Sequence, residues 1–320
     1  MTEVSIVICS RNRAQQLRRA LDAVAQIRTR HEWEIVVVDN GSTDETPDVI
    51  AAARSTLPGL RSVVEPRRGS GAARDRGWRE SRGRLVAMTD DDCYVTPDYV
   101  DNVLAAFADR PAAGCIGGRI LLFDPSDAPV TIDPRETPVR LEPKRFLPAG
   151  SLHSANLSFL RTTLEKIGGV DPALGAGTPF PCEDVDAIAA ILWLGQEAWF
   201  DPRPTVHHHH GRKAADIPQL KRGYDRGRGA YYAKYLLRRD SRASYVSGWL
   251  SEVFANGRPS SFAREVRSAW TYLRTKGRGY SVLMLVPIVL AGCLSLAGAS
   301  VRALFRRAIR RAAKPASTFA

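Results

Sequence analysis

The chain has 320 residues, 44% of them hydrophobic and 25% charged, which is the composition of a folded protein with room for one large domain and an appendage. Its five cysteines are scattered without a C-x-x-C pair, which argues against a disulfide framework and a structural zinc site. The net charge of +12 is compatible with nucleic acid, anionic lipid or a phosphorylated substrate as partner.

Strands and helices alternate through the first ninety residues. Runs of apolar and β-branched residues predict buried strands, and apolar residues at helical spacing predict the helices between them. The predicted strands are 4–9, 34–39, 60–64 and 85–89, and the helices are 15–27, a segment ending near residue 53, and 71–80. This alternation predicts an α/β fold with a doubly wound, mostly parallel sheet, whose ligands gather at the carboxyl ends of the strands.

The remainder of the chain is less regular. A stretch rich in Pro and charge, 125–148, predicts a long irregular loop that could cover the site. Strands are expected at 157–160 and 198–201, with helices at 161–167 and 183–194. We therefore expect an α/β domain over 1–215 and a helical extension over 216–279.

The C-terminal region suggests contact with a membrane. Residues 280–301 contain no charged side chain and are long enough to cross a bilayer as a helix, although a buried packing helix is the alternative. The start of residues 302–320 is predicted to form a basic amphipathic helix that suits anionic headgroups. The alternative is a terminal helix exposed to solvent. No signal-peptide pattern precedes the first strand. We therefore expect a protein on the cytoplasmic face of a bacterial membrane, peripheral or single-pass, that binds no nucleic acid.

Three consecutive aspartates, Asp90, Asp91 and Asp92, directly follow the predicted strand 85–89. Adjacent carboxylates repel one another, and a divalent cation such as Mg²⁺ or Mn²⁺ relieves that repulsion and often brings a phosphate with it. The alternative is a solvated acidic loop that caps the next helix. Because Ser10 follows one predicted strand and Asp39 ends another, the three polar clusters are expected to meet in one crevice.

Several motifs together resemble the inverting family 2 glycosyltransferases, which have a GT-A fold. No single motif would suffice, but their order and spacing match over about the first two-thirds of the chain. The matching pieces are Val7–Arg13, Val37–Asp44, Gly71–Gly77, Thr89–Asp92, Ala155–Asn156, Gly168–Asp171, Glu183–Asp184 and His207.

This resemblance implies a nucleoside-diphosphate sugar as donor, most often linked to UDP or dTDP. Asp39 is expected to accept hydrogen bonds from the nucleobase. The other residues expected to bind the nucleotide sugar are Cys9, Ser10, Arg11, Arg74, Asp90 and Asp91. The acceptor is expected to be a glycan or polyprenyl-linked hydroxyl of the cell envelope, bound on the side of Asn156, Gly169 and Asp171.

The resemblance also implies a metal-dependent reaction that inverts the anomeric carbon. Asp92 and His207 are expected to hold Mn²⁺ or Mg²⁺, with His207 preferred over His208 because it comes first after the preceding loop. Asp184 is expected to be the base that takes the acceptor's proton, with Glu183 supporting it or touching the acceptor. The alternative for this pair is an ordinary acidic first turn of a helix.

Three other functions fit the sequence less well. A dinucleotide-dependent oxidoreductase would carry glycines in the turn after its first strand, and residues 9–14 contain none. A sugar nucleotidyltransferase would carry a glycine-rich basic loop near its N-terminus. A non-catalytic, membrane-associated protein that binds sugar nucleotides remains the alternative, and the combined presence of Asp92, Asp184 and His207 speaks against it.

Overall fold

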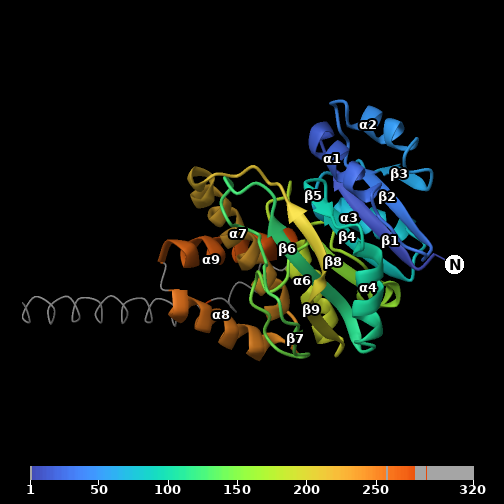
Figure 1. Cartoon of the computed structure of the whole chain (residues 1–320). Coiled ribbons are helices and arrows are strands. Elements are labelled where there is room, and N and C mark those ends of the chain that lie inside the picture. Colours follow the sequence, from blue (N-terminus) through green and yellow to red (C-terminus); the bar gives the residue numbers. More distant parts are fainter. Residues whose placement is uncertain (1, 257–258, 278–285, 287–320) are drawn as a thin grey trace, which may run out of the picture. The chain divides into compact units, whose positions relative to one another are not determined.

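The computed structural model describes residues 2–256, 259–277 and 286, and it divides the chain into two compact units, Met1–Gly227 and Arg228–Ala320. The first elements of the first unit agree with the predicted alternation (Figure 1). They are β1 (Val4–Ser10), α1 (Ala14–Val24), β2 (Trp33–Asp39), α2 (Thr46–Ala53), β3 (Leu60–Val64), α3 (Ser70–Glu80) and β4 (Leu85–Asp90).

The next elements depart more from the prediction. They are β5 (Cys93–Val95), α4 (Tyr99–Ala108), β6 (Ala113–Leu122), β7 (Val139–Leu141), β8 (Asn156–Leu160), α5 (Arg161–Ile167), α6 (Glu183–Trp193) and β9 (Glu197–His208). The predicted loop 125–148 is irregular except for β7. β9 continues to His208, whereas the predicted strand stopped at residue 201 because Pro202 and Pro204 follow it.

The central sheet is mixed, with its N-terminal half fully parallel. The strand order is β3-β2-β1-β4-β8-β6-β9-β5, and β7 pairs with β9. β1 runs parallel to β2 and β4, and β2 runs parallel to β3. β8 is antiparallel to both β4 and β6, while β6 and β9 are parallel to one another. The carboxyl ends of β1, β2 and β4 therefore share one edge of the sheet.

Helices cover both faces of this sheet. Alternate residues of β1, such as Ile6 and Ile8, belong to an apolar core with buried residues of α1, α2 and α4. The intervening residue Val7 faces α3, because a side chain added at Gly77 of that helix would meet Val7 and Val38. β1, β2 and β4 are thus buried from both sides, which explains their continuous apolar runs, whereas the edge strand β3 is only partly buried.

The second unit, described by itself, is helical. Its first helix, α7 (Ile217–Leu236), starts in the first unit, and α8 (Arg242–Asn256) and α9 (Pro259–Thr275) follow. The helical extension predicted over 216–279 covers these three helices. Aromatic side chains fill its core, namely Tyr231, Tyr232, Tyr235, Tyr245, Trp249 and Phe262. The indole of Trp249 donates a hydrogen bond to the buried carboxylate of Glu265 at 2.8 Å.

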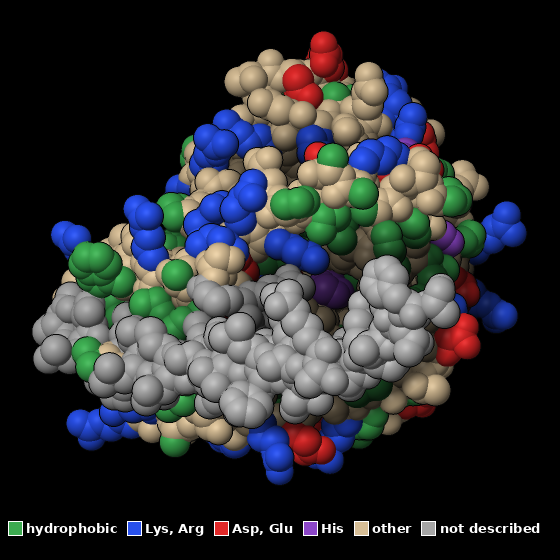
Figure 2. Space-filling model, turned by 90° about the vertical axis from the view of Figure 1, so that its left-hand side faces the viewer, with side chains coloured by type: hydrophobic (Ala, Val, Ile, Leu, Met, Phe, Trp, Pro, Cys, Tyr) green, Lys and Arg blue, Asp and Glu red, His purple; other side chains and the backbone are tan. Residues whose placement is uncertain are grey.

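No helix within the described ranges is long and apolar enough to span a membrane. The predicted membrane segment 280–301, apart from Val286, and the basic tail 302–320 lie outside the described residues. Figure 2 shows one face of the molecule, on which Lys and Arg side chains are widespread and acidic side chains are few, in keeping with the net charge of +12.

Candidate active site

The parallel half of the sheet brings the predicted polar residues to one edge. Ser10 at the end of β1 is in register with Asp39 at the end of β2, and Cys9 is in register with Asp90 at the end of β4. The predicted convergence of three strand ends is therefore present in the structure. Ser10 and Asp39 are buried, and Cys9 and Asp90 are partly exposed.

The turns after β1 and β2 are fastened to one another. Asp39 accepts a hydrogen bond from the backbone N–H of Ser42 at 2.8 Å, and Arg11 donates to the carbonyl of Asn40. Asn40 also donates to the carbonyls of Glu65 and Arg67 and accepts from the Gly69 N–H at 2.9 Å. Asn40, which sequence reasoning did not single out, thus ties this turn to the loop that leads into α3.

Arg74, a buried residue of α3, joins two acidic groups from distant parts of the chain. Its guanidinium forms ion pairs with Asp90 and with Glu183. Burial opposes its charge, but the two carboxylates outweigh that cost and raise the pKa of Arg74. The predicted donor side and the predicted catalytic pair are therefore connected through one side chain.

Close backbone packing makes this connection possible. A side chain at Gly71, in the first turn of α3, would lie 2.2 Å from the carbonyl oxygen of Leu174. Gly175 has a φ of +110° and lies against Ser70. Ser70 donates a hydrogen bond to Glu183 at 2.5 Å. These glycines let α3 approach the segment before α6 closely enough for Ser70 and Arg74 to reach Glu183.

Glu183 and Asp184 are neighbours with different surroundings. Glu183 is 6% exposed, and burial raises its pKa even though Arg74 opposes the shift. Asp184 is partly exposed and accepts backbone hydrogen bonds from Ser154 at 3.2 Å and Val185 at 2.7 Å. Of the two carboxylates, Asp184 is therefore the more accessible from solvent.

The aspartate triplet is largely buried, which overturns the alternative of a solvated acidic loop. Asp91 and Asp92 are 4% and 3% exposed. Asp91 accepts a hydrogen bond from Ser10 at 2.7 Å and pairs with Arg13 Nε at 3.3 Å, and burial raises its pKa to about 7. Because its oxygens already have these partners, Asp91 supports the site rather than reaching outward, whereas Asp90 is partly exposed.

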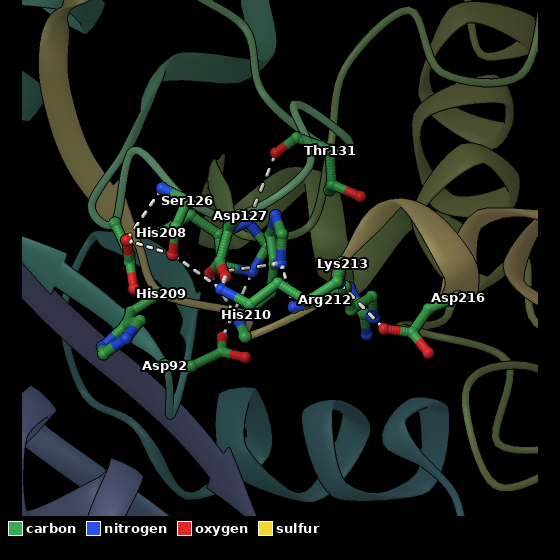
Figure 3. A network of polar contacts seen from close by, with 12 residues as sticks. Asp92, Ser126, Asp127, Thr131, His208, His209, His210, Arg212, Lys213 and Asp216 are labelled. Carbon is green, nitrogen blue, oxygen red and sulfur yellow. Dashed lines mark hydrogen bonds and ion pairs between the residues drawn. The ribbon is translucent and has the colours of Figure 1, made fainter.

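Asp92 lies between the guanidinium of Arg13 and the imidazole of His208, and Figure 3 shows Asp92 together with His208. Its carboxylate accepts from Arg13 Nη2 at 2.7 Å and lies 3.3 Å from His208 Nε2. Burial opposes ionisation of Asp92, but the hydrogen bond from His208 and the charge of Arg13 outweigh it, so its pKa lies below the usual value. Arg13 precedes α1 and was missed by the sequence reasoning, although it belongs to the matched segment Val7–Arg13.

The histidine beside Asp92 is His208, which corrects the preference for His207. Side chains alternate along β9, and Val206 and His208 are buried whereas His207 is partly exposed. β5 pairs Cys93 with His208 and Tyr94 with His207. The prediction was wrong because the strand was expected to stop earlier, so the alternation of its side chains was not applied to the histidines.

The donor atoms around Asp92 suit a hard or borderline divalent cation. Ligand atoms of Asp92, Cys93 and His208 lie within 4.8 Å of one another. Burial raises the pKa of the Cys93 thiol well above its usual value, so it stays protonated and is a poor ligand. The carboxylate of Asp92 and the imidazole of His208 remain, which is a donor set that Mn²⁺ or Mg²⁺ accepts.

The residues predicted on the acceptor side prove to be mainly scaffold. Asn156 is 1% exposed, donates to the carbonyls of Arg119 and Pro204, and accepts from the Tyr99 hydroxyl, each at 2.9 Å. Gly169, with φ at +95°, leaves no room for a side chain above Asp75. Asp171 accepts a hydrogen bond from the Ala173 N–H at 3.0 Å and is partly exposed. An amide whose donors and acceptor all have protein partners has little left for a ligand.

With this geometry in place, the family can be assigned. The model of glycosyl transferase family 2 matches residues 5–167, just over half of the chain. The chain belongs to this family.

Relatives of known sequence agree with the assignment. The chain is 27% identical over 179 residues to an uncharacterized glycosyltransferase from Nostoc sp., covering 53% of this chain and 54% of that protein. It is 32% identical over 137 residues to the succinoglycan biosynthesis protein ExoU of Rhizobium meliloti, covering 39% and 40% of the two chains. The aligned regions thus span about half or less of these relatives.

Solved structures show the same GT-A fold. A mannosyltransferase from Pyrobaculum calidifontis, in complex with GDP-Man and Mn²⁺, has a TM-score of 0.56 and 20% identity, covering 92% of this chain and 87% of the other. TarS (residues 1–349) from S. aureus, in complex with UDP-GlcNAc, has a TM-score of 0.61 and 14% identity, covering 92% and 88%. At these identities the likeness concerns the fold.

Proposed function

We propose that this protein transfers a sugar from a nucleoside-diphosphate donor to a hydroxyl of a glycan or polyprenyl-linked acceptor, with inversion at the anomeric carbon. The observation that carries the proposal is the ion pairing of Arg74 with both Asp90 and Glu183. It ties the strand ends where a donor would lie to the helix end that presents Asp184. Family membership supports the same reaction class.

In this proposal the nucleotide lies over the carboxyl ends of β1, β2 and β4. Asp39 accepts from the base, and the turns held by Asn40 shape the pocket. A UDP- or dTDP-linked hexose or deoxyhexose is our preferred donor, and the structures similar to this chain include one with UDP-GlcNAc and one with GDP-Man. Asp92 and His208 would hold Mn²⁺ or Mg²⁺. Neutralisation of the departing diphosphate is the chemistry that such an ion supplies.

Asp184 is the proposed general base. Its carboxylate takes the proton of the acceptor hydroxyl while the hydroxyl oxygen bonds to the anomeric carbon, and the bond to the diphosphate breaks with its electron pair on the leaving oxygen. The two backbone N–H groups that donate to Asp184 fix its orientation. Glu183, buried against Arg74, holds the start of α6 in place and does not reach the acceptor.

The Asp184→Asn variant tests the proposed base. Transfer should fall by about 10³-fold while donor binding, measured by calorimetry, stays within about twofold, because a general base contributes on that scale. Asp48→Asn is the matched control, since Asp48 is likewise an acidic residue in the first turn of a helix, α2. Near-normal transfer by Asp184→Asn would contradict the proposal and return this pair to an ordinary acidic first turn.

The donor is identified by titrating UDP, dTDP and GDP, each with Mn²⁺ and then with EDTA. Metal-dependent binding of one nucleotide would define the donor class. A folded sample that binds none of them would contradict the transferase proposal.

We further propose that the protein acts at the cytoplasmic face of a bacterial membrane. The support is the uncharged segment 280–301 followed by the basic residues of 302–320. The relative ExoU is named for succinoglycan biosynthesis, which fits an envelope glycan as acceptor. Deletion of residues 280–320 should move the protein from the membrane fraction to the soluble fraction, and unchanged membrane association would rule out this segment as the anchor.

A further inference from the structure

The carbonyl of Thr131 contacts one of the two ring nitrogens of His208. His208 Nδ1 lies 3.3 Å from the Thr131 carbonyl oxygen, while Nε2 of the same ring faces Asp92 (Figure 3). A carbonyl oxygen only accepts hydrogen bonds, so Nδ1 must carry a proton to bond it, and without a cation Nε2 likewise donates to the Asp92 carboxylate. A cation that binds between the ring and Asp92 would displace the Nε2 proton, and because the carbonyl keeps the other proton on Nδ1, the Nε2 lone pair would be free to bind that cation.

Thr131 holds an unusual backbone conformation to do this. Its φ is +55°, in the left-handed region that β-branched residues rarely enter. Such strain persists only where surrounding contacts impose it, and it is concentrated at functional sites. One such contact is made by the Thr131 side chain, whose Oγ1 lies 3.0 Å from the hydroxyl of Tyr224 on α7. Both side chains are near the surface.

The rest of the β6 loop, residues 123–131, is fastened to the chain that follows His208. The side chain of Asp127 is fully buried, and its two oxygens accept from Lys213 Nζ at 2.7 Å and the Gly211 N–H at 2.8 Å. The Ala128 N–H donates to the Arg212 carbonyl at 2.8 Å. The buried ring of His210 lies edge-on to His208, with ring centroids 4.9 Å apart. The loop and the histidine segment therefore form one connected unit.

We propose that Thr131 is a positioning residue for the cation site, and that its strained backbone, held by Tyr224, keeps Nδ1–H of His208 bonded to its carbonyl and so orients the ring with Nε2 beside Asp92. Tyr224 acts through Thr131 and touches neither His208 nor Asp92 by any contact in the described part of the chain. The cation-binding part of this inference rests on the proposed function. The orientation of the ring by the carbonyl does not, because it concerns the free protein.

The experiment combines substitutions at the two residues in the full-length protein. Tyr224→Phe and Thr131→Val each remove the contact between the two hydroxyls. Residue 131 is still β-branched in both variants and disfavours a positive φ, so its backbone should relax and its carbonyl should turn away from His208. Mn²⁺ affinity should then fall about tenfold, the lower end of the effect of losing an outer partner of a metal ligand. The double variant should bind Mn²⁺ as tightly as either single variant, because the same contact is lost in all three proteins.

Glycine at position 131 provides the rescue. Thr131→Gly accepts a positive φ without strain, so the carbonyl should stay in place and Mn²⁺ affinity should remain within about twofold of the parent. Tyr224→Phe in that background should have no further effect. A merely structural role for Tyr224 would instead give the same loss whether residue 131 is Thr or Gly.

The hydrogen bond from Nδ1 to the carbonyl is measured separately by ¹⁵N NMR of the metal-free protein, as the exchange of the His208 Nδ1 proton with water, with the His208 signals assigned through His208→Gln. We expect slow exchange in the parent and in Thr131→Gly, and faster exchange in Tyr224→Phe. Fast exchange in the parent, or unchanged exchange and Mn²⁺ affinity in both Tyr224→Phe and Thr131→Val, would overturn the inference. A parent protein that shows slow exchange but binds no Mn²⁺ would refute the metal site and leave the positioning intact.

Discussion

The two sides of the candidate site are built in different ways. On the proposed donor side, β1, β2 and β4 run parallel and each has a polar residue at its carboxyl end, with Ser10 in register with Asp39. On the other side, His208 lies on β9, a 12-residue strand whose pairing with β6 is interrupted by register shifts. The loop that contains Thr131 contacts its ring. Arg74 is the contact that joins the donor side to Glu183 on α6.

This difference teaches which parts of such a site a sequence reveals. A polar residue directly after an apolar strand of a parallel sheet lies at the ligand edge whatever the details of the strand. A polar residue inside a long strand lies on one face or the other according to its position, and a bulge or an error of one residue reverses the assignment.

The largest effect is expected where the two sides are joined. Arg74→Gln leaves Asp90 and Glu183 without their cation, and Glu183 is 6% exposed, so the free energy of unfolding should fall by about 3 kcal/mol. Urea denaturation measures this loss. Arg76→Gln is the control on the same helix, because its ion pair with Glu80 is solvent-exposed and should contribute less than about 0.5 kcal/mol.

Equal losses in the two variants would contradict this view of Arg74. They would mean that its ion pairs are no more important than a surface pair, and that α3 and α6 are held together by the close glycine packing alone.

The next effect separates the two histidines of β9. His208→Ala should reduce Mn²⁺ affinity by at least the 10- to 100-fold that loss of an outer metal partner costs. His207→Ala should change it by less than about twofold, because the His207 side chain lies on the opposite side of the strand from His208. Calorimetric titration of both variants with Mn²⁺ checks this. The reverse order would restore the preference for the first histidine.

Much of the donor side was accessible from the sequence. The structure places Ser10, Asp39 and Asp90 at strand ends and Glu183 and Asp184 at the start of a helix, as predicted, because these positions are local properties of the sequence. Arg13 and Asn40 were missed, since a residue that acts by long-range hydrogen bonds carries no local signal.

The other side was less accessible for two physical reasons. Pro202 and Pro204 suggested that the last strand ends early, but β9 continues through them beside the register shift between Gly117 and Arg119. The apolar residues Ala198, Phe200 and Val206 share their phase with His208, and this period of two could have identified it. Asn156 belongs to a matched motif, yet nothing local shows that its amide is already satisfied by three protein partners.

The smallest effect concerns the parallel half away from the ligand edge, and it tests how strongly that half depends on a buried charge. Glu34 on β2 is 8% exposed and accepts from Ser5, the Arg82 N–H and Arg61. Burial opposes its charge, but these hydrogen bonds and the Arg61 charge outweigh it and lower the pKa of Glu34 below its usual value of 4.5. Because the folded state then holds its proton less tightly than the unfolded state, ionised Glu34 stabilises the fold above the usual pKa.

Glu34→Gln should therefore lower the free energy of unfolding by about 1 kcal/mol at pH 7, the scale of a hydrogen-bonded buried charge. The difference between the two proteins should shrink as the pH falls below 4.5 and through the folded pKa of Glu34, where the parent carboxylate also becomes neutral. Urea denaturation at several pH values measures it. A difference that stays constant into acid would show that the Gln side chain fits the site badly for reasons of shape, and that the charge of Glu34 does not stabilise the parallel half.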